Sequence, residues 1–219
     1  MASKLFLSYS HKNKKLAHRL REALEQFGFN VFLAHDDIQV SKRWRKEILK
    51  NLKTCDVFVP ILTKEFMASD WTDHETGYAL SRGARIVPVK VGIDPYGFIG
   101  EYQATPLKKS ALAETCWKIM SSLSNDDRLG DEAREGAIDA FLHSGTFVEA
   151  QFNLSHLVKL RPFSRTQLAK IIEGSSHNQN IYGCYKARPL MQELLYQARG
   201  KVPRNVIAKY RKAVQSWDQ

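Results

Sequence analysis

A tryptophan and a glutamate stand four residues apart in the polar stretch SDWTDHETGYAL, residues 69–80. On an α-helix, positions i and i+4 lie one above the other, so Trp71 and Glu75 would project from the same face. Such a pair serves either packing or chemistry. The adjacent His74 points about 100° away and is expected at the surface.

A second set of candidate residues lies in SYSHKNK, residues 8–14, between a strand-like run and a helix-like run. Backbone N–H groups at the start of a helix attract anions such as phosphate, and the serines, His11 and the lysines add donors and charge. The loop has no glycine, which argues against a P-loop or a G-x-G-x-x-G dinucleotide fingerprint. The alternative is that Ser10 or Asn13 caps the following helix.

A third loop, AHDDIQVSKRW at residues 34–44, carries the adjacent acids Asp36 and Asp37 and ends in Trp44. Paired carboxylates perform acid–base chemistry or hold ribose hydroxyls. Neighbouring residues in a loop rarely point the same way, so turn formation is the alternative for at least one of them.

The elements that position these loops follow a regular alternation. Apolar runs without polar faces, which are typical of buried parallel strands, alternate with amphipathic stretches that predict helices. Ligands of such doubly wound α/β sheets bind at the carboxyl ends of the strands. The three candidate stretches each follow one of the first three predicted strands, so they lie at this edge. Gly28 and Gly83 are expected to end helices. The predicted strands are 4–9, 30–35, 56–62 and 85–91, and the predicted helices are 13–29, 42–53, 64–82 and 107–123.

Beyond residue 124 the pattern is helical only, so we predict two domains, 1–124 and 125–219, the second of unassigned role. Their net charges are +6 and +4, so the basic excess is spread and neither part is a dedicated nucleic-acid arm. DNA binding by the tail is the weaker alternative to a solvated charged face, with five cations available for phosphates: Arg161, Arg165, Lys170, Lys186 and Arg188. The predicted helices are 131–143, 145–160, 164–173, 187–199 and 203–216.

The bulk properties indicate a globular protein. The 219 residues are 43% hydrophobic, with a net charge of +10 that favours anionic partners. No apolar run is long enough to cross a bilayer and the start MASKLFLSYS does not resemble a signal peptide, so we expect a cytoplasmic protein. The three cysteines, Cys55, Cys116 and Cys184, have no metal-binding or disulfide spacing and are expected to be buried thiols, so no metal site is predicted.

Together the loops resemble the TIR (Toll/interleukin-1 receptor) domain family over residues 1 to about 124. The resemblance rests on FLSYSHKNKKLAHRLREALEQFGFNVFL, on HDDIQVSKRWRKEI as the segment called the BB loop with its helix, on CDVFVPILTKEFMASDWTDHETGYAL, and on RIVPVKV with PYGFIGEYQA. It implies a flavodoxin-like parallel sheet with helices on both faces, followed here by a small all-α region.

Enzymatic members of this family cleave NAD⁺ and carry a glutamate four residues after a tryptophan, as Glu75 follows Trp71. The resemblance therefore implies Glu75 as the catalytic residue, NAD⁺ as the substrate and no separate cofactor. Hydrolysis to ADP-ribose and cyclisation to an ADP-ribose isomer both stay open, and bacterial antiphage defence or toxicity is the implied role. The implied substrate-binding residues are Ser8, Tyr9, His11, Asp36, Asp37, Trp44 and Trp71.

Other TIR domains signal without catalysis by assembling with one another. The alternative function is therefore a signalling adaptor, or a secreted mimic that engages host TIR proteins. Both alternatives imply self-association through the TIR domain. We also expect a nucleotide or protein trigger at the C-terminal region, and neither a membrane nor a nucleic acid as a partner.

Overall fold

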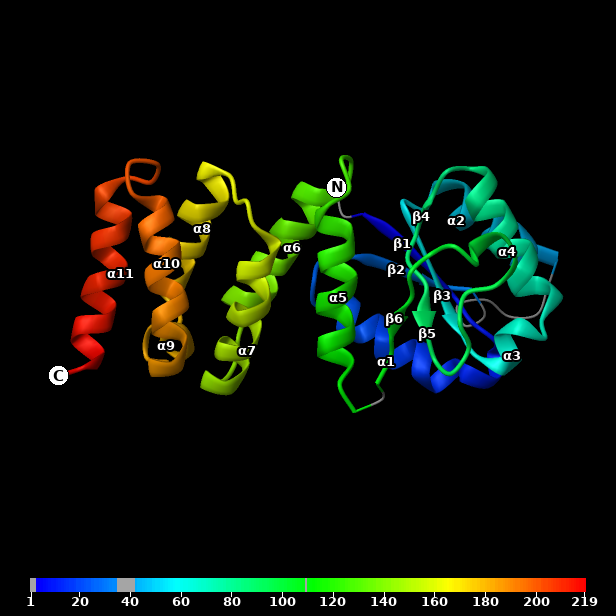
Figure 1. The fold of residues 1–219 in the computed structure, drawn as a ribbon, viewed down its shortest axis with the longest axis horizontal. Helices are drawn as coiled ribbons and strands as arrows, with labels where there is room; N and C mark the ends of the chain where they lie inside the picture. The colour runs from blue at the N-terminus through cyan, green and yellow to red at the C-terminus, as the bar shows by residue number, and fades with distance from the viewer. Residues whose placement is uncertain (1–2, 35–41, 109) are drawn as a thin grey trace. The chain divides into compact units, whose positions relative to one another are not determined.

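The chain forms two compact units, Met1–Ser122 and Leu123–Gln219. They are seen in a computed structural model that describes residues 3–34, 42–108 and 110–219, with the side chains of 42–44 excepted. Unit 1 holds the predicted α/β layer and unit 2 is helical (Figure 1).

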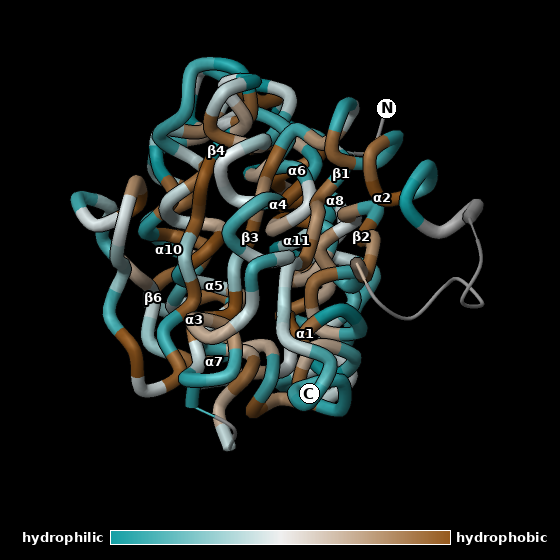
Figure 2. Tube along the Cα trace, turned by 90° about the vertical axis from the view of Figure 1, so that its right-hand side faces the viewer, coloured by the Kyte–Doolittle hydropathy of each residue, from teal (hydrophilic) through white to brown (hydrophobic). Residues whose placement is uncertain are grey.

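Unit 1 is built on an all-parallel sheet with the strand order β2-β1-β3-β5-β6, and β4 also pairs with β3. This is the flavodoxin-like order, in which the chain reverses direction across the sheet between β1 and β3. Hydrophobic stretches lie along β1 and β3 at the centre of the sheet in Figure 2, and every residue of β3 is buried. The strands are β1 Lys4–Ser8, β2 Asn30–Leu33, β3 Val57–Leu62, β4 Arg85–Ile86, β5 Val89–Lys90 and β6 Thr105–Pro106.

Helices cover both faces of the sheet (Figure 1). On one face, Phe6 and Phe58 of the strands share a core with Ile48 and Leu52 of α2 and with Ala79 of α4. On the other face lie α1 and α5. The predicted helix ends at Gly28 and Gly83 are confirmed, with φ of 79° and 74° in the left-handed region that glycine favours. The helices are α1 Lys14–Glu25, α2 Lys42–Thr54, α3 Lys64–Met67, α4 Asp70–Ser81 and α5 Leu112–Ser124, with 3₁₀ turns η1 His11–Asn13 and η2 Gly97–Ile99.

The single strand predicted over 85–91 is wrong in detail, because it divides into β4 and β5. Val87 lies in the interval and donates its N–H to the carbonyl of Phe58 at 2.9 Å. In a parallel ladder the carbonyl of Val87 would then accept from residue 60 of β3, but Pro60 has no N–H. The ladder with β3 is therefore interrupted, and it resumes where Val89 pairs with Ile61.

Two predicted helices also have different bounds. The helix over 64–82 is broken between α3 and α4, where the Thr72 hydroxyl donates to the carbonyls of Phe66 at 2.6 Å and Ser69 at 2.7 Å. The helix predicted over 107–123 begins only at Leu112. Residues 105–106 form the strand β6, which the sequence pattern did not predict. Leu107 still donates its N–H to the carbonyl of Lys90 in β5 at 2.9 Å.

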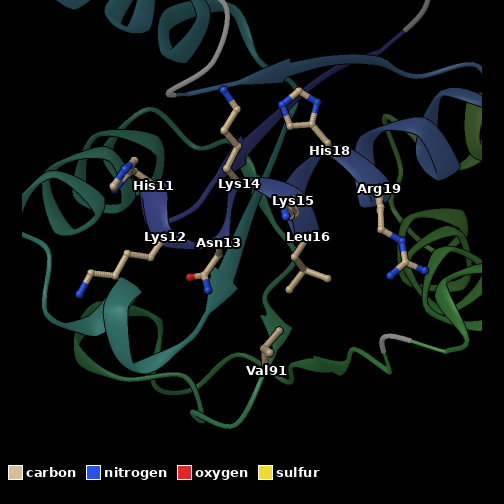
Figure 3. A pocket seen from close by; sticks show the side chains of 9 residues that line it. All are labelled: His11, Lys12, Asn13, Lys14, Lys15, Leu16, His18, Arg19 and Val91. Carbon is tan, nitrogen blue, oxygen red and sulfur yellow. The ribbon is translucent and has the colours of Figure 1, made fainter.

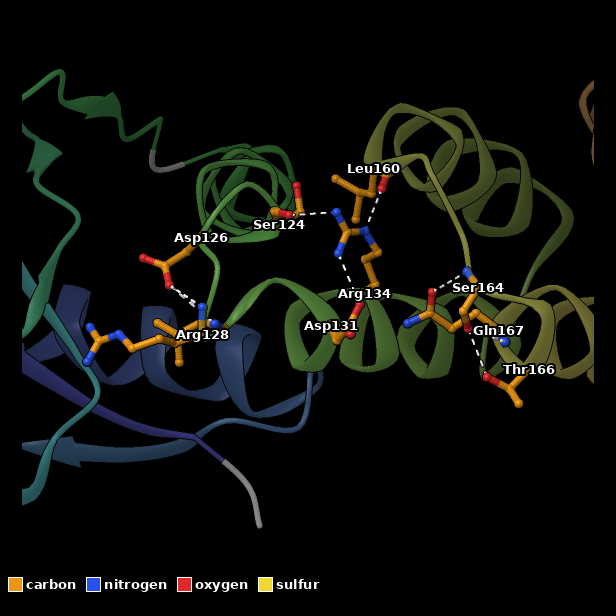
Figure 4. A network of polar contacts seen from close by, with 10 residues as sticks. Ser124, Asp126, Arg128, Asp131, Arg134, Leu160, Ser164, Thr166 and Gln167 are labelled. Atoms are coloured by element: carbon orange, nitrogen blue, oxygen red, sulfur yellow. Dashed lines mark hydrogen bonds and ion pairs between the residues drawn. The ribbon is translucent and has the colours of Figure 1, made fainter.

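Unit 2 is a bundle in which α8 packs against α6, α10 and α11. Its core is apolar, and three of its helices begin at a side-chain cap: Thr146 at α7, Ser164 at α8 and Asn178 at α9. At α8, Ser164 and Gln167 form a reciprocal capping box. Arg134 of α6 donates to the carbonyls of Ser124 at 2.7 Å and Leu160 at 2.9 Å, which fixes the chain on either side of α6 and α7 (Figure 4). The helices are α6 Gly130–Leu142, α7 Phe147–Leu157, α8 Arg165–Ser175, α9 Gln179–Tyr182, α10 Arg188–Ala198 and α11 Arg204–Trp217, with 3₁₀ turns η3 Val158–Leu160 and η4 Tyr185–Ala187.

The polar segment SSHNQN, residues 175–180, leads into the short helix α9. Asn178 explains this start, because its side-chain oxygen accepts from the N–H of Asn180 at 2.9 Å. Its amide nitrogen donates to the carbonyls of Leu142 at 2.9 Å and Ser144 at 3.0 Å, which ties α9 to the end of α6. The three cysteines are free and buried, as predicted.

Candidate functional site

One face of α4 carries the central residue of the candidate site. Its buried positions are Thr72, Glu75, Thr76 and Ala79, which recur at the spacing of a helix face that packs on a sheet. The two threonine hydroxyls donate to backbone carbonyls nearby, at distances of 2.6–2.7 Å. Glu75, with a relative exposure of 2%, is therefore the one ionisable side chain on this buried face.

Ser8, the last residue of β1, meets Glu75 across the interface between the sheet and α4. Side chains two residues apart on a strand share a face, so Ser8 points to the same side as Phe6, where α2 and α4 pack. The Ser8 hydroxyl donates to Oε2 of Glu75 at 2.5 Å, and both residues are buried. The other carboxylate oxygen, Oε1, has no hydrogen-bond partner among the described residues.

Burial determines the charge state of this carboxyl. Removal from water raises the pKa of Glu75 from 4.5 to about 7, and the hydrogen bond from Ser8 lowers it by a smaller amount. Both the protonated and the ionised forms are thus present near neutral pH. A carboxylate whose pKa lies near the working pH is typical of functional sites.

The raised pKa of Glu75 should make stability depend on pH. The unfolded chain releases this proton near pH 4.5 and the folded chain near pH 7, so the stabilisation is complete below pH 4.5 and is lost as the pH rises to 7. We expect the free energy of unfolding of wild type, relative to Glu75→Gln, to fall by about 3 kcal/mol across this interval. Urea unfolding of both proteins at a series of pH values measures it, and a constant difference would contradict the assignment.

Trp71 lies one turn before Glu75, but its ring is at the surface, with a relative exposure of 39%. The guanidinium carbon of Arg45, from α2, is 5.4 Å from the ring centroid, a cation–π geometry. The ring of His74 meets it edge-on at 6.3 Å, and His74 is exposed, as expected. The indole therefore connects α2 to α4 beside the buried acid.

The loop after β1 divides into buried and exposed parts. Tyr9 is buried and His11 is exposed. Neither Ser10 nor Asn13 caps a helix with its side chain, contrary to the capping alternative. The Asn13 side-chain oxygen instead accepts from the hydroxyl of Thr63 at 2.8 Å, which joins the loops after β1 and β3.

A cationic hollow of about 900 Å³ follows η1 and the first turns of α1. Figure 3 shows its side chains, among which four carry a formal positive charge and Val91 stands apart, after β5. A concave surface of one charge sign concentrates anions, so this hollow suits a phosphate-bearing ligand. Its lining is His11, Lys12, Asn13, Lys14, Lys15, Leu16, His18, Arg19 and Val91.

The structure brings together some of the residues predicted from sequence. Ser8 and Glu75 are bonded, Tyr9 adjoins Ser8 in the chain, and His11 lines the cationic hollow, of which Glu75 is not a lining residue. Asp36 and Asp37 lie outside the described residues, and Trp44 belongs to α2 without a described side chain.

Sequence reasoning missed two features of this edge of the sheet. The first is the bond between Ser8 and Glu75. A signal for it was present, because Ser8 is two residues after the apolar Phe6 and therefore points to the same face of the sheet. The second is the bond from Thr63 to Asn13, for which the sequence holds no signal, because it depends on two loops 50 residues apart.

The fold and the site define a class of protein: a flavodoxin-like parallel α/β domain with a buried acid at the carboxyl end of its first strand. Comparison with known families then gives the particular family, since the TIR domain matches residues 5–116. This chain belongs to the TIR domain family, and the resemblance drawn from sequence is confirmed.

Among solved structures, a similar one is the TIR domain of the Toll-related receptor TRR-2 from Hydra magnipapillata. The two are 13% identical in sequence with a TM-score of 0.45, and the match covers 53% of this chain and 93% of that one. Comparison with curated protein sequences finds no match. In the part of the chain that the structure describes, no helix is both long enough and apolar enough for a membrane span.

Proposed function

We propose that this chain cleaves the bond between nicotinamide and ribose in NAD⁺, with Glu75 as the catalytic carboxylate. The supporting observation is a buried carboxylate of which Oε2 is held by Ser8 while Oε1 has no partner among the described residues. An unsatisfied buried acceptor costs about 1–3 kcal/mol. Unsatisfied buried polar atoms are often found at functional sites, where a ligand supplies the missing hydrogen bond. Oε1 of Glu75 lies at the carboxyl edge of a parallel sheet, where ligands of such sheets bind.

The proposed reaction needs one ionised carboxylate. The bond from ribose C1′ to the nicotinamide nitrogen breaks, and its electron pair leaves with nicotinamide, which departs as a neutral molecule without receiving a proton. The ribose becomes a cation resembling an oxocarbenium ion, which ionised Glu75 stabilises. Water that adds to C1′ and loses a proton gives ADP-ribose, and attack by the adenine of the same molecule gives a cyclic isomer.

The cationic hollow along η1 and α1 supports the choice of substrate class. Its lysines and Arg19 complement the negative charge of a pyrophosphate, and His11 adds a further donor. The hollow lies along η1 and α1, which follow β1 in the chain, and the Ser8–Glu75 pair lies at the end of β1. An extended dinucleotide is therefore a better match to this region than a small neutral substrate.

Burial of Glu75 also implies that activity depends on a change around it. With a relative exposure of 2%, its carboxylate reaches a substrate only when the residues that cover it shift. TIR domains commonly self-associate, and contact with a second copy is a source of free energy for such a shift. We therefore propose that assembly activates the reaction.

The direct test incubates the full chain with NAD⁺ and measures nicotinamide by chromatography, both dilute and clustered on beads or by a fused oligomerisation domain. We expect nicotinamide release per molecule to be higher in the clustered protein. Absence of release in both states would overturn the proposal and favour the non-catalytic adaptor. One observation favours the adaptor function: Glu75 is buried and hydrogen-bonded to Ser8. An acid that only stabilises the fold needs no access to a substrate.

A further inference from the structure

The positive charge of unit 2 is concentrated in its last helix and in the turn before it. Residues 199–217 contain six lysines and arginines and no acidic residue, whereas the rest of unit 2 has eight basic and ten acidic residues. The net charge of +4 over residues 125–219 does not reveal this uneven distribution. Residues 199–217, which we call the basic segment, are therefore the part of unit 2 to search for a partner of opposite charge.

Most of the other described cations of unit 2 that the sequence offered for phosphates are already neutralised. Arg161 pairs with Glu193 at 2.8 Å, Lys170 with Glu135 and Asp139 at 2.9 and 2.7 Å, and Arg188 with Asp218 at 2.6 Å. Arg165 and Lys186 remain exposed outside the basic segment. Ion pairs thus engage three of the five cations named for the weaker alternative, DNA binding by the tail.

The basic segment surrounds a surface hollow of about 680 Å³. Arg204, Arg211 and Lys212 stand at i, i+7 and i+8 on α11, so they follow one stripe of the helix, and all three are exposed. Arg199, which directly follows α10, also lines the hollow, on the N-terminal side of α11. Gln215 continues the stripe by one turn, and no acidic side chain lines the hollow.

The length of this stripe favours a polymeric anion over a single phosphate. Arg204 and Lys212 are separated by a helical rise of about 12 Å. Phosphates of one nucleic-acid strand follow one another at about 3.4 Å along the duplex axis, so several lie within this span.

A membrane surface matches the hollow less well. Interfacial helices insert a face of exposed large apolar residues between lipids. The described exposed residues of that kind do not line this hollow: Tyr196 lies on α10, Trp217 lies at the last position of α11, and Ile207 is half-buried.

We propose that the basic segment binds the phosphodiester backbone of a nucleic acid, chiefly through Arg204, Arg211 and Lys212. Contacts of this kind read charge and not base sequence, so duplex and single strands of any sequence are ligands. The inference is independent of NAD⁺ cleavage, because it concerns unit 2 alone. It departs from the expectation of no nucleic-acid partner, which followed from the spread of the basic charge over both regions of the chain.

The test uses the full chain, a fluorescently labelled random-sequence duplex and the matching single strand, with anisotropy as the readout and without NAD⁺. Three phosphate contacts predict that the association constant falls about 40-fold between about 50 and 200 mM salt. The variant Arg204→Gln/Arg211→Gln/Lys212→Gln should bind at least about fivefold more weakly at the lower salt and lose most of this salt dependence.

The matched control is Lys159→Gln/Arg165→Gln/Lys186→Gln, which removes the same charge from exposed positions elsewhere in unit 2. It should bind as wild type does, and circular dichroism should show both variants folded. Equal binding by the two triple variants would overturn the proposal. So would binding of wild type to vesicles of acidic phospholipid with no binding to either oligonucleotide.

Discussion

Replacing Glu75 by glutamine should reduce nicotinamide release from NAD⁺ by at least about 100-fold, the size of effect seen when one preorganised electrostatic group is removed from an active site. The amide has nearly the same shape as the carboxylate, and its oxygen still accepts the Ser8 hydroxyl. It carries no charge, so it does not stabilise the cation that forms on ribose. The loss should appear in kcat, because the interaction is made with the transition state and not with bound NAD⁺.

The matched control for this substitution is Asp70→Asn, which removes one negative charge from the exposed first turn of the same helix. Wild-type rates for Asp70→Asn together with loss of activity in Glu75→Gln would identify the carboxylate as the cause. Equal rates for wild type and Glu75→Gln would rule out Glu75 as the catalytic group. Thermal unfolding of each protein separates a lost reaction from a lost fold.

The layer architecture could be predicted from sequence because burial on both faces gives a continuous apolar run. The run VFVPIL indicates a central strand even with a proline in it, and β3 is such a strand. The consequence of that proline was not predictable in the same way. Pro60 interrupts the pairing of the neighbouring segment 85–91, so the signal for the break lies 25 residues or more from its effect.

The candidate site shows the same limit. Glu75 was identified by its spacing from Trp71, but the structure separates the two environments, with the carboxylate in the core and the indole at the surface. Helical spacing predicts that two residues are neighbours on one helix. It does not predict how deeply each is buried, because that depends on how α4 sits against β1 and α2.

The distribution of charge in the helical region is a third feature that the sequence alone did not predict correctly. Averaged over 95 residues the excess is small, and five cations of the middle helices were the natural candidates for phosphate binding. Three of them pair with acids distant in sequence, such as Arg161 with Glu193. In α11 one lysine is paired in the same way, Lys209 with Glu173 at 3.7 Å, while Arg204, Arg211 and Lys212 lie exposed along a segment that holds no acid of its own.

Replacing Ser8 by alanine should lower nicotinamide release at pH 7 by about tenfold and restore it at higher pH. The hydroxyl donates to the ionised form of Glu75 at 2.5 Å and so lowers its pKa, against the larger effect of burial. A hydrogen bond to a charged group contributes about 1.5–3 kcal/mol, or about 1–2 pKa units. Without it the carboxyl stays protonated at pH 7, and the catalytic base form appears only under more alkaline conditions.

The measurement is the pH dependence of kcat/KM, which reports the ionisation of the free enzyme. The midpoint for Ser8→Ala should lie about 1–2 units above that of wild type, with the two profiles converging at alkaline pH. Ser10→Ala removes a hydroxyl from the same loop that makes no helix cap, and should leave the profile unchanged. A uniform loss for Ser8→Ala at every pH would mean that Ser8 only packs against α4, whereas a shifted midpoint means that it sets the charge of Glu75.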